Sequence, residues 1–181
     1  FDGTDDYLSV PSNSDFNFDG DFTIETFIYP NNNNRYMLIA HRASSVNFTL
    51  EMHRNSTGDI EFFGGNYSGT TPIVSTTISG GFTGGWHHVA VTRSGNVFRL
   101  FFDGDLKASA TQSVTFNTSA ELRIGADNHP TVGSRFFFNG YLDDFRIIKG
   151  TALYTDSFTV PTSALGATGT TISVVGGFED Q

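Results

Sequence analysis

The chain has 181 residues, no cysteine, and a formal net charge of −9 at pH 7. An acidic surface with only 10 Lys and Arg residues repels phosphate backbones, so we expect no nucleic-acid binding. The lack of cysteine excludes disulfides and cysteine-ligated zinc sites. No apolar run approaches membrane-spanning length, so we expect no insertion into a membrane. With 19 Phe and 20 Gly, the composition favours an all-β fold with many turns.

Alternating apolar residues, bounded by Gly, Pro and Asn, predict strands along the whole chain. In 22–29 the alternation puts Phe22, Ile24 and Ile28 on one face, and Pro30 ends the strand. No segment sustains the apolar spacing of a helix. In chain order, the expected strands are 7–10, 22–29, 36–41, 47–53, 59–63, 73–78, 86–93, 97–102, 107–111, 121–125, 136–149 and 172–175.

The stretch 86–102 is the most informative one. It reads as two strands joined by a tight turn at Ser94-Gly95-Asn96, where Gly and Asn tolerate a positive φ. A hairpin this apolar needs a second sheet to cover it. We expect Trp86, at the start of the first strand, to lie in the core between the two sheets.

Three stretches resemble one known family. They are FDGTDDYLSVPSNSDFNFDGDFTIETFIYP at the start, WHHVAVTRSGNVFRLFFDGD in the middle and GYLDDFRIIKGTALYTDSFTVP near the end. In this order they resemble laminin-G-like domains of the concanavalin A-like lectin/glucanase superfamily. The resemblance implies a two-sheet antiparallel β-sandwich, a concanavalin A-like jelly roll. We expect residues 1–181 to form one such domain, excised from a longer protein because the chain begins with Phe1.

The residues argue against catalysis. The glucanase branch of the superfamily uses a strand with Glu-x-Asp, in which two carboxylates act as nucleophile and acid. No glutamate of this chain has an Asp two residues later; they are Glu25, Glu51, Glu61, Glu121 and Glu179. His87 and His88 are adjacent, so on a strand they point to opposite faces and cannot share a metal. We expect both histidines to pack and to form hydrogen bonds, and we expect the chain not to be an enzyme.

The resemblance also implies a calcium site. In many members of the superfamily a calcium ion bridges the first and last strands. The matching ligands here are Asp2, the Gly3 carbonyl and Asp143, with Asp144 as the alternate, and hard oxygen donors suit Ca²⁺. We expect such an ion to be structural. The alternative is that Asp2 caps a turn while Asp143 or Asp144 pairs with Arg146.

Sugar binding requires aromatic faces and polar groups that can bond to hydroxyls. Loops of a sandwich cluster at its ends and can present such groups together. Ordinary loop chemistry is the alternative for each residue. The candidates for glycan binding are Tyr36, Asn66, Tyr67, Asn128, His129 and Arg135.

Together these features predict a non-catalytic, lectin-like adhesion module that binds glycans. The tail GTALYTDSFTVPTSAL resembles laminin-G-like modules of bacterial and phage exterior proteins. We therefore expect an extracellular, cell-surface or virion location, with oligomerisation through the parent protein. Two alternatives remain: a structural or protein-binding sandwich of a larger assembly, and an accessory module of a carbohydrate-active enzyme.

Overall fold

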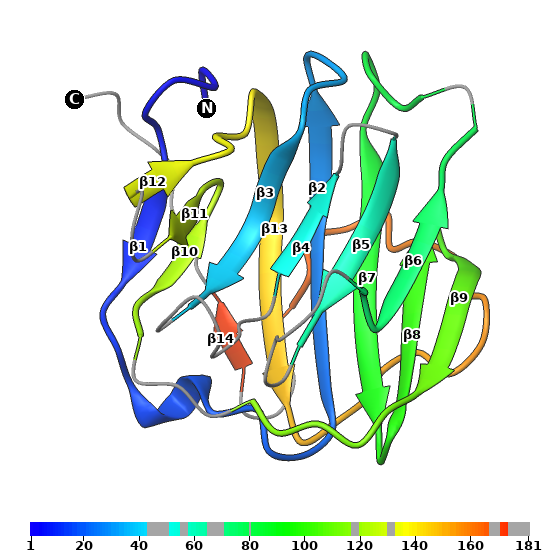
Figure 1. The fold of residues 1–181 in the computed structure, drawn as a ribbon. Helices are drawn as coiled ribbons and strands as arrows, with labels where there is room; N and C mark the ends of the chain where they lie inside the picture. Colours follow the sequence, from blue (N-terminus) through cyan, green and yellow to red (C-terminus); the bar gives the residue numbers. More distant parts are fainter. Residues whose placement is uncertain are drawn as a thin grey trace.

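Two six-stranded antiparallel sheets face each other in a sandwich (Figure 1). The computed structural model describes residues 1–42, 51–54, 58–64, 71–79, 81–116, 120–129, 133–166 and 171–173. The first sheet has the order β1 (Leu8–Val10), β10 (Leu122–Ile124), β3 (Tyr36–His41), β4 (Glu51–Arg54), β5 (Asp59–Phe63) and β6 (Val74–Thr77). The second has the order β14 (Thr171–Ser173), β13 (Gly140–Lys149), β2 (Phe22–Pro30), β7 (His87–Ser94), β8 (Val97–Phe102) and β9 (Asp105–Thr111). The predicted all-β sandwich is confirmed.

The core lies between the two sheets and is rich in phenylalanine. Phe22 at the start of β2 contacts the rings of Phe62, Phe98 and Phe116, with centroids 5.8–6.2 Å apart. All four side chains are at most 2% exposed. Burial of one such ring contributes about 1.5–3 kcal/mol, so this cluster holds the two sheets together.

The predicted hairpin at 86–102 forms as β7 and β8. Ser94 pairs with Val97, and Gly95 adopts the positive φ of 59° that the turn requires. A second turn follows, in which Asp103 and Gly104 also have positive φ values. A Cβ atom at Gly104 would collide with the carbonyl oxygen of Phe158, so glycine is required there.

Some expected boundaries were wrong. The strand expected at 136–149 begins only at Gly140; residues 136–139 lie outside the named strands and follow β12 (Gly133–Arg135). This short strand pairs with β11 (Asp127–His129), which the sequence pattern did not predict. Residues 47–50 and 174–175 of two expected strands lie outside the described part of the chain. Within the described ranges the helical segment is the 3₁₀ turn η1 (Ser14–Phe16), and no helix has the length and hydropathy of a membrane span.

Candidate functional site

Three aromatic side chains form a row across the outer face of the second sheet. Tyr29 of β2 pairs with Tyr141 of β13, and Trp86 precedes β7 at the position next to Tyr29. The ring centroid of Tyr29 lies 5.7 Å from that of Trp86 and 5.9 Å from that of Tyr141, both edge to face. Trp86 is 51% exposed and Tyr141 is 60% exposed. We call Trp86, Tyr29 and Tyr141 the aromatic row.

Strand alternation explains why these rings point outward. Ile28 is fully buried between the sheets, so its neighbour Tyr29 must project from the opposite face. Direct pairing then places Tyr141 on the same side of the sheet as Tyr29. A cluster of solvent-exposed aromatic rings of this size is uncommon on a protein surface and indicates a binding surface.

A cavity of about 340 Å³ adjoins the aromatic row and shares Trp86 with it. Phe27, Asp143, Asp144 and residues 161–164 also line it. The pairing register of β13 with β2 changes between Asp143 and Arg146, and Asp144 has a positive φ of 49°. This irregularity brings two successive carboxylates to the same cavity, although regular strand geometry would point them to opposite faces.

Residues 151–166, which we call the C-terminal strap, cross the outer face of the second sheet and cover its middle strands. Its orange trace passes behind the second sheet in Figure 1. Hydroxyl groups of the sheet hold it: Thr23 Oγ1 donates to the Thr151 carbonyl at 2.9 Å, and Thr92 Oγ1 donates to the Tyr154 carbonyl at 2.8 Å. Tyr154 also stacks on Phe158, with ring centroids 3.6 Å apart. The strap therefore leaves the aromatic row uncovered and borders the cavity.

A fully buried carboxylate lies beneath the strap. Glu25 accepts hydrogen bonds from Arg146 at 2.6 and 2.9 Å, from His88 at 3.1 Å and from the Tyr154 hydroxyl at 3.0 Å. Burial alone would raise the pKa of Glu25, but the hydrogen bonds from His88 and Arg146 together lower it below its ordinary value. Burial and the Glu25 charge raise the pKa of Tyr154, so its hydroxyl stays protonated and donates. Glu25 thus anchors the strap and, being 0% exposed, does not face solvent.

The structure places four of the six residues predicted to bind glycans. The prediction that Tyr36 lies in a glycan-binding loop is wrong. Tyr36 begins β3, is 1% exposed and packs edge to face on Phe138 in the core. Asn128 and His129 lie in β11, opposite β12, which contains Arg135. Asn66 and Tyr67 lie outside the described residues. The hairpin of β11 and β12 therefore brings three of the six candidates together.

Two cations flank one ring at this hairpin. The guanidinium carbons of Arg35 and Arg135 lie 4.0 and 4.6 Å from the ring centroid of Phe136. Arg135 also donates to the buried carboxylate of Asp127 at 2.8 Å. This end of the first sheet carries positive charge, whereas the cavity beside the aromatic row carries two carboxylates.

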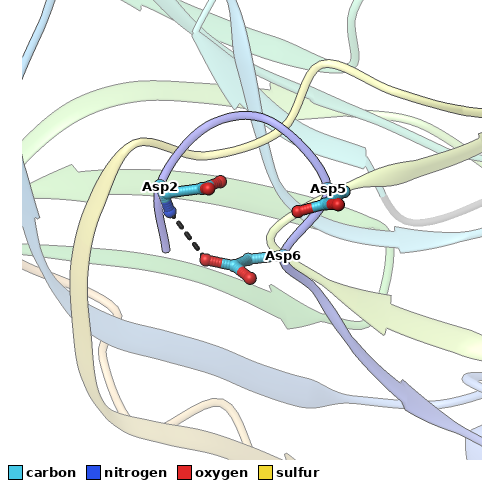
Figure 2. A group of neighbouring side chains, drawn as sticks. All are labelled: Asp2, Asp5 and Asp6. Atoms are coloured by element: carbon cyan, nitrogen blue, oxygen red, sulfur yellow. Dashed lines mark hydrogen bonds between the residues drawn. The ribbon is translucent and has the colours of Figure 1, made fainter. Parts of the chain in front are cut away.

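The first residues lie beside the start of β13, but Asp2 and Asp143, two ligands of the calcium hypothesis, lie apart. Asp2 forms a bridge with Asn139, so it lies beside the start of β13. Asp143 is four residues farther along, about 13 Å at the rise of a strand, which is too far for one ion to bind both carboxylates. Instead, Asp2 lies close to Asp5 and Asp6, and the three carboxylates are within 4.8 Å of one another (Figure 2). Hard carboxylate oxygens fit the donor preference of Ca²⁺, although Asp6 accepts a hydrogen bond from the Asp2 amide and Asp2 accepts one from Thr4.

The expected pairing of Asp143 or Asp144 with Arg146 is not found, because Arg146 binds Glu25. The turn-capping alternative for Asp2 matches the hydrogen bond that its carboxylate accepts from the Thr4 amide at 2.7 Å. Gly3 has a positive φ of 83°, as such a turn requires. The backbone of these residues is therefore held by local hydrogen bonds.

Sequence reasoning missed the aromatic row. Trp86 was expected in the core, but it is half exposed. The signal for Tyr29 was present, because alternation in 22–29 puts it on the face opposite to Phe22 and Ile28. Nothing in the local pattern pairs Tyr29 with Tyr141, which lies more than one hundred residues away.

A family model described as "Concanavalin A-like lectin/glucanases superfamily", of the laminin G type, matches residues 2–156. The chain belongs to this superfamily. The matched part includes the whole aromatic row and the first residues of the C-terminal strap. A search of curated proteins gave no match.

Solved structures of the superfamily fold are similar to this chain at low identity. Domains LG4-5 of the mouse laminin α1 chain align over 81% of this chain with a TM-score of 0.65 and 17% identity. Domain 4 of AbnA, an extracellular arabinanase from Geobacillus stearothermophilus, was solved in complex with arabinotriose. It aligns over 81% of this chain and 68% of its own chain, with a TM-score of 0.60 and 17% identity. The CBM40 domain of Ruminococcus gnavus IT-sialidase, bound to α2,3-sialyllactose, aligns over 83% and 92% of the two chains, with a TM-score of 0.61 and 13% identity. The alignment spans 39% of the laminin chain. At these identities the likeness establishes the fold.

Proposed function

We propose that this chain is a non-catalytic carbohydrate-binding module and that glycans bind at the aromatic row. The observation that carries the proposal is the exposure of Trp86 and Tyr141 beside Tyr29 on the outer face of the second sheet. Such rings can stack on the apolar faces of sugars, while the carboxylates of the adjoining cavity can accept hydrogen bonds from hydroxyls. Two similar structures, the arabinanase domain and the CBM40 domain, contain bound saccharides, which supports the proposal.

The module would belong to an extracellular adhesion protein of a bacterial surface, a phage or a virion. A shallow surface site buries little area, so affinity for one short glycan is expected near millimolar, about −4 kcal/mol. Several copies on a fibre or cell surface would then supply avidity. The similarity to a domain of an arabinanase supports a second parent, a carbohydrate-active enzyme in which this chain is the accessory module.

Substitution of the row tests the location of the site. Trp86→Ala and Tyr141→Ala should each weaken glycan binding about tenfold, because each removes one of the two most exposed stacking rings from the contact. Tyr7→Ala is the matched control, because Tyr7 is also exposed, at 39%, but lies next to β1 of the other sheet. Binding is measured by calorimetry with a glycan identified on an array, and circular dichroism verifies the fold of each variant.

Two results would contradict this location or this function. If both row variants bind like the wild type while Arg135→Ala or His129→Ala loses binding, the site lies at the hairpin of β11 and β12. If no glycan binds to the wild type on an array of neutral and anionic polysaccharides, the chain is a structural or protein-binding sandwich.

A further inference from the structure

The cavity beside the aromatic row continues the same surface and differs from it in chemistry. Both share Trp86, so a chain of sugars stacked on the row can reach the cavity without leaving the protein surface. Asp143 pairs directly with Phe27, two residues from Tyr29 on the same face of β2. The row itself spans two strand spacings, about 10 Å, which is longer than one sugar ring.

Among the described residues, the lining of the cavity contains two carboxylates and no cation. Arg146, two residues after Asp144 on β13, is 6% exposed and is held by Glu25 and by the Gly166 carbonyl at 2.7 Å. The guanidinium group of Arg146 is therefore already bound to the groups that hold the strap. An anionic sugar in the cavity would meet two like charges without a compensating partner, whereas a hydroxyl group would meet acceptors.

The two carboxylates keep acceptor capacity for a ligand. An ionised carboxylate has about four acceptor sites. Asp143 Oδ1 accepts from the Asp144 amide at 2.8 Å, and Asp144 Oδ2 accepts from the Leu165 amide at 3.1 Å. These bonds fix the position of both groups while leaving further lone pairs directed to the surroundings. Such fixed acceptors favour a ligand that brings several hydroxyl donors.

We propose that the aromatic row and this cavity form one extended subsite for neutral oligosaccharides, in which Asp143 and Asp144 accept hydrogen bonds from sugar hydroxyls and exclude uronic and sialic acids. The inference rests on the proposed glycan-binding function and names its ligand class. The guanidinium groups of Arg35 and Arg135 lie over Phe136 beside β12, and neither residue lines the cavity.

The test uses matched neutral and anionic probes at fixed salt. Lactose is compared with 3′-sialyllactose, and galactotriose with trigalacturonic acid, each by nuclear magnetic resonance titration of the wild-type chain. Binding of neutral gluco-, xylo- and arabino-saccharides is measured from one to three sugars. We expect the neutral member of a matched pair to bind about tenfold more tightly, and affinity to rise with chain length because the row is longer than one ring.

Asp143→Asn and Asp144→Asn remove the charge and keep an acceptor oxygen. Asn tolerates the positive φ of Asp144, so the backbone is retained. Each variant should weaken neutral binding severalfold and bring the affinities of the paired probes together. Equal melting temperatures of variants and wild type would show that the strap is still in place.

Different results would contradict the proposed ligand class and the proposed glycan-binding function. If the anionic probes bind as tightly as the neutral ones, and Arg135→Ala rather than Asp143→Asn removes that binding, the ligand class is wrong but glycan binding stands. If neutral probes bind and neither Asn variant changes their affinity or selectivity, the carboxylates have no part in recognition. If no probe of either class binds, the proposed function itself is wrong.

Discussion

Three carboxylates in the N-terminal loop bear on the calcium hypothesis. Asp2, Asp5 and Asp6 gather at one point of the surface (Figure 2). Asp143 lines the cavity on the second sheet. The stabilisation of the chain ends by calcium stays a prediction. An ion that binds only the folded state stabilises it by about 2.7 kcal/mol at a concentration one hundred times its dissociation constant.

The expected result is a higher melting temperature with calcium and a lower one in chelator. Asp5→Asn should reduce this response, since Asp5 contributes a carboxylate to the group. Asp143→Asn is the comparison and should leave the response intact, because register separates it from Asp2. A response that is lost in Asp143→Asn and kept in Asp5→Asn would restore the bridge implied by family resemblance. Identical melting curves with calcium and chelator would leave the turn-capping role of Asp2.

At the scale of elements, the C-terminal strap depends on the buried group around Glu25. Glu25→Ala would leave the Arg146 cation buried without its carboxylate partner, which costs about 3–5 kcal/mol. Tyr154→Phe removes one hydrogen bond to the same carboxylate and should cost about 1 kcal/mol. Urea unfolding of both variants gives the two free energies of unfolding. Equal losses in the two variants would show that Glu25 does not anchor the strap through Arg146.

The C-terminal strap also limits how much of the outer face of the second sheet is exposed to solvent. Phe101 of β8 faces outward, yet Tyr154 and Phe158 of the strap cover it, with ring centroids 6.0 and 5.4 Å away. Farther along the sheet face, Trp86 remains exposed. The strap thus divides one sheet face into a covered structural part and an uncovered part suited to recognition.

At the scale of the whole molecule, buried titratable groups predict a loss of stability in acid. Burial lowers the pKa of His41 from 6.5 to about 4, while its hydrogen bond to the Ala120 carbonyl opposes the shift. Between these two values the unfolded chain binds a proton that the folded chain does not. The free energy of unfolding therefore falls as pH drops from 6.5 to 4, by up to about 3 kcal/mol.

His41→Gln should flatten the unfolding free energy between pH 6.5 and 4.5, because the glutamine does not titrate. Its side-chain amide can still donate to the Ala120 carbonyl. The lowered pKa of Glu25 stabilises the folded chain at higher pH. Below about 4.5 the carboxylate takes up a proton in the unfolded chain before it does so in the folded chain, so this stabilisation is lost as the pH falls further. Denaturant unfolding of wild type and His41→Gln across this range is the measurement. A wild type whose stability is unchanged between pH 6.5 and 4.5 would contradict the burial of a neutral His41.

Tyr36 and Trp86 show where sequence reasoning reaches its limit. Both residues stand at or next to the start of a strand. Alternation shows which neighbouring residues share a face with each of them, but not which face of the sheet is covered by other parts of the chain. All six residues of β3 are buried, because the second sheet covers one face and the hairpin of β11 and β12 packs against the strand. Trp86 lies at the uncovered end of the second sheet, beyond the strap. The expected positions of the two rings were therefore reversed.

By itself, the sequence determined most of the strands, the turn at Gly95 and the superfamily, because these depend on side-chain alternation, on backbone conformations open to glycine, and on ordered motifs. It also determined which residues of β2 share a face. Only the tertiary structure decided which outer face is covered, since that depends on where residues 151–166 return across the sheet. It alone joined Tyr29 to Trp86 and Tyr141, and brought Asp143 and Asp144 to one cavity through a register shift. Such contacts between residues distant in sequence leave no periodic signal in any one segment, so the proposed binding surface had to be found in the folded chain.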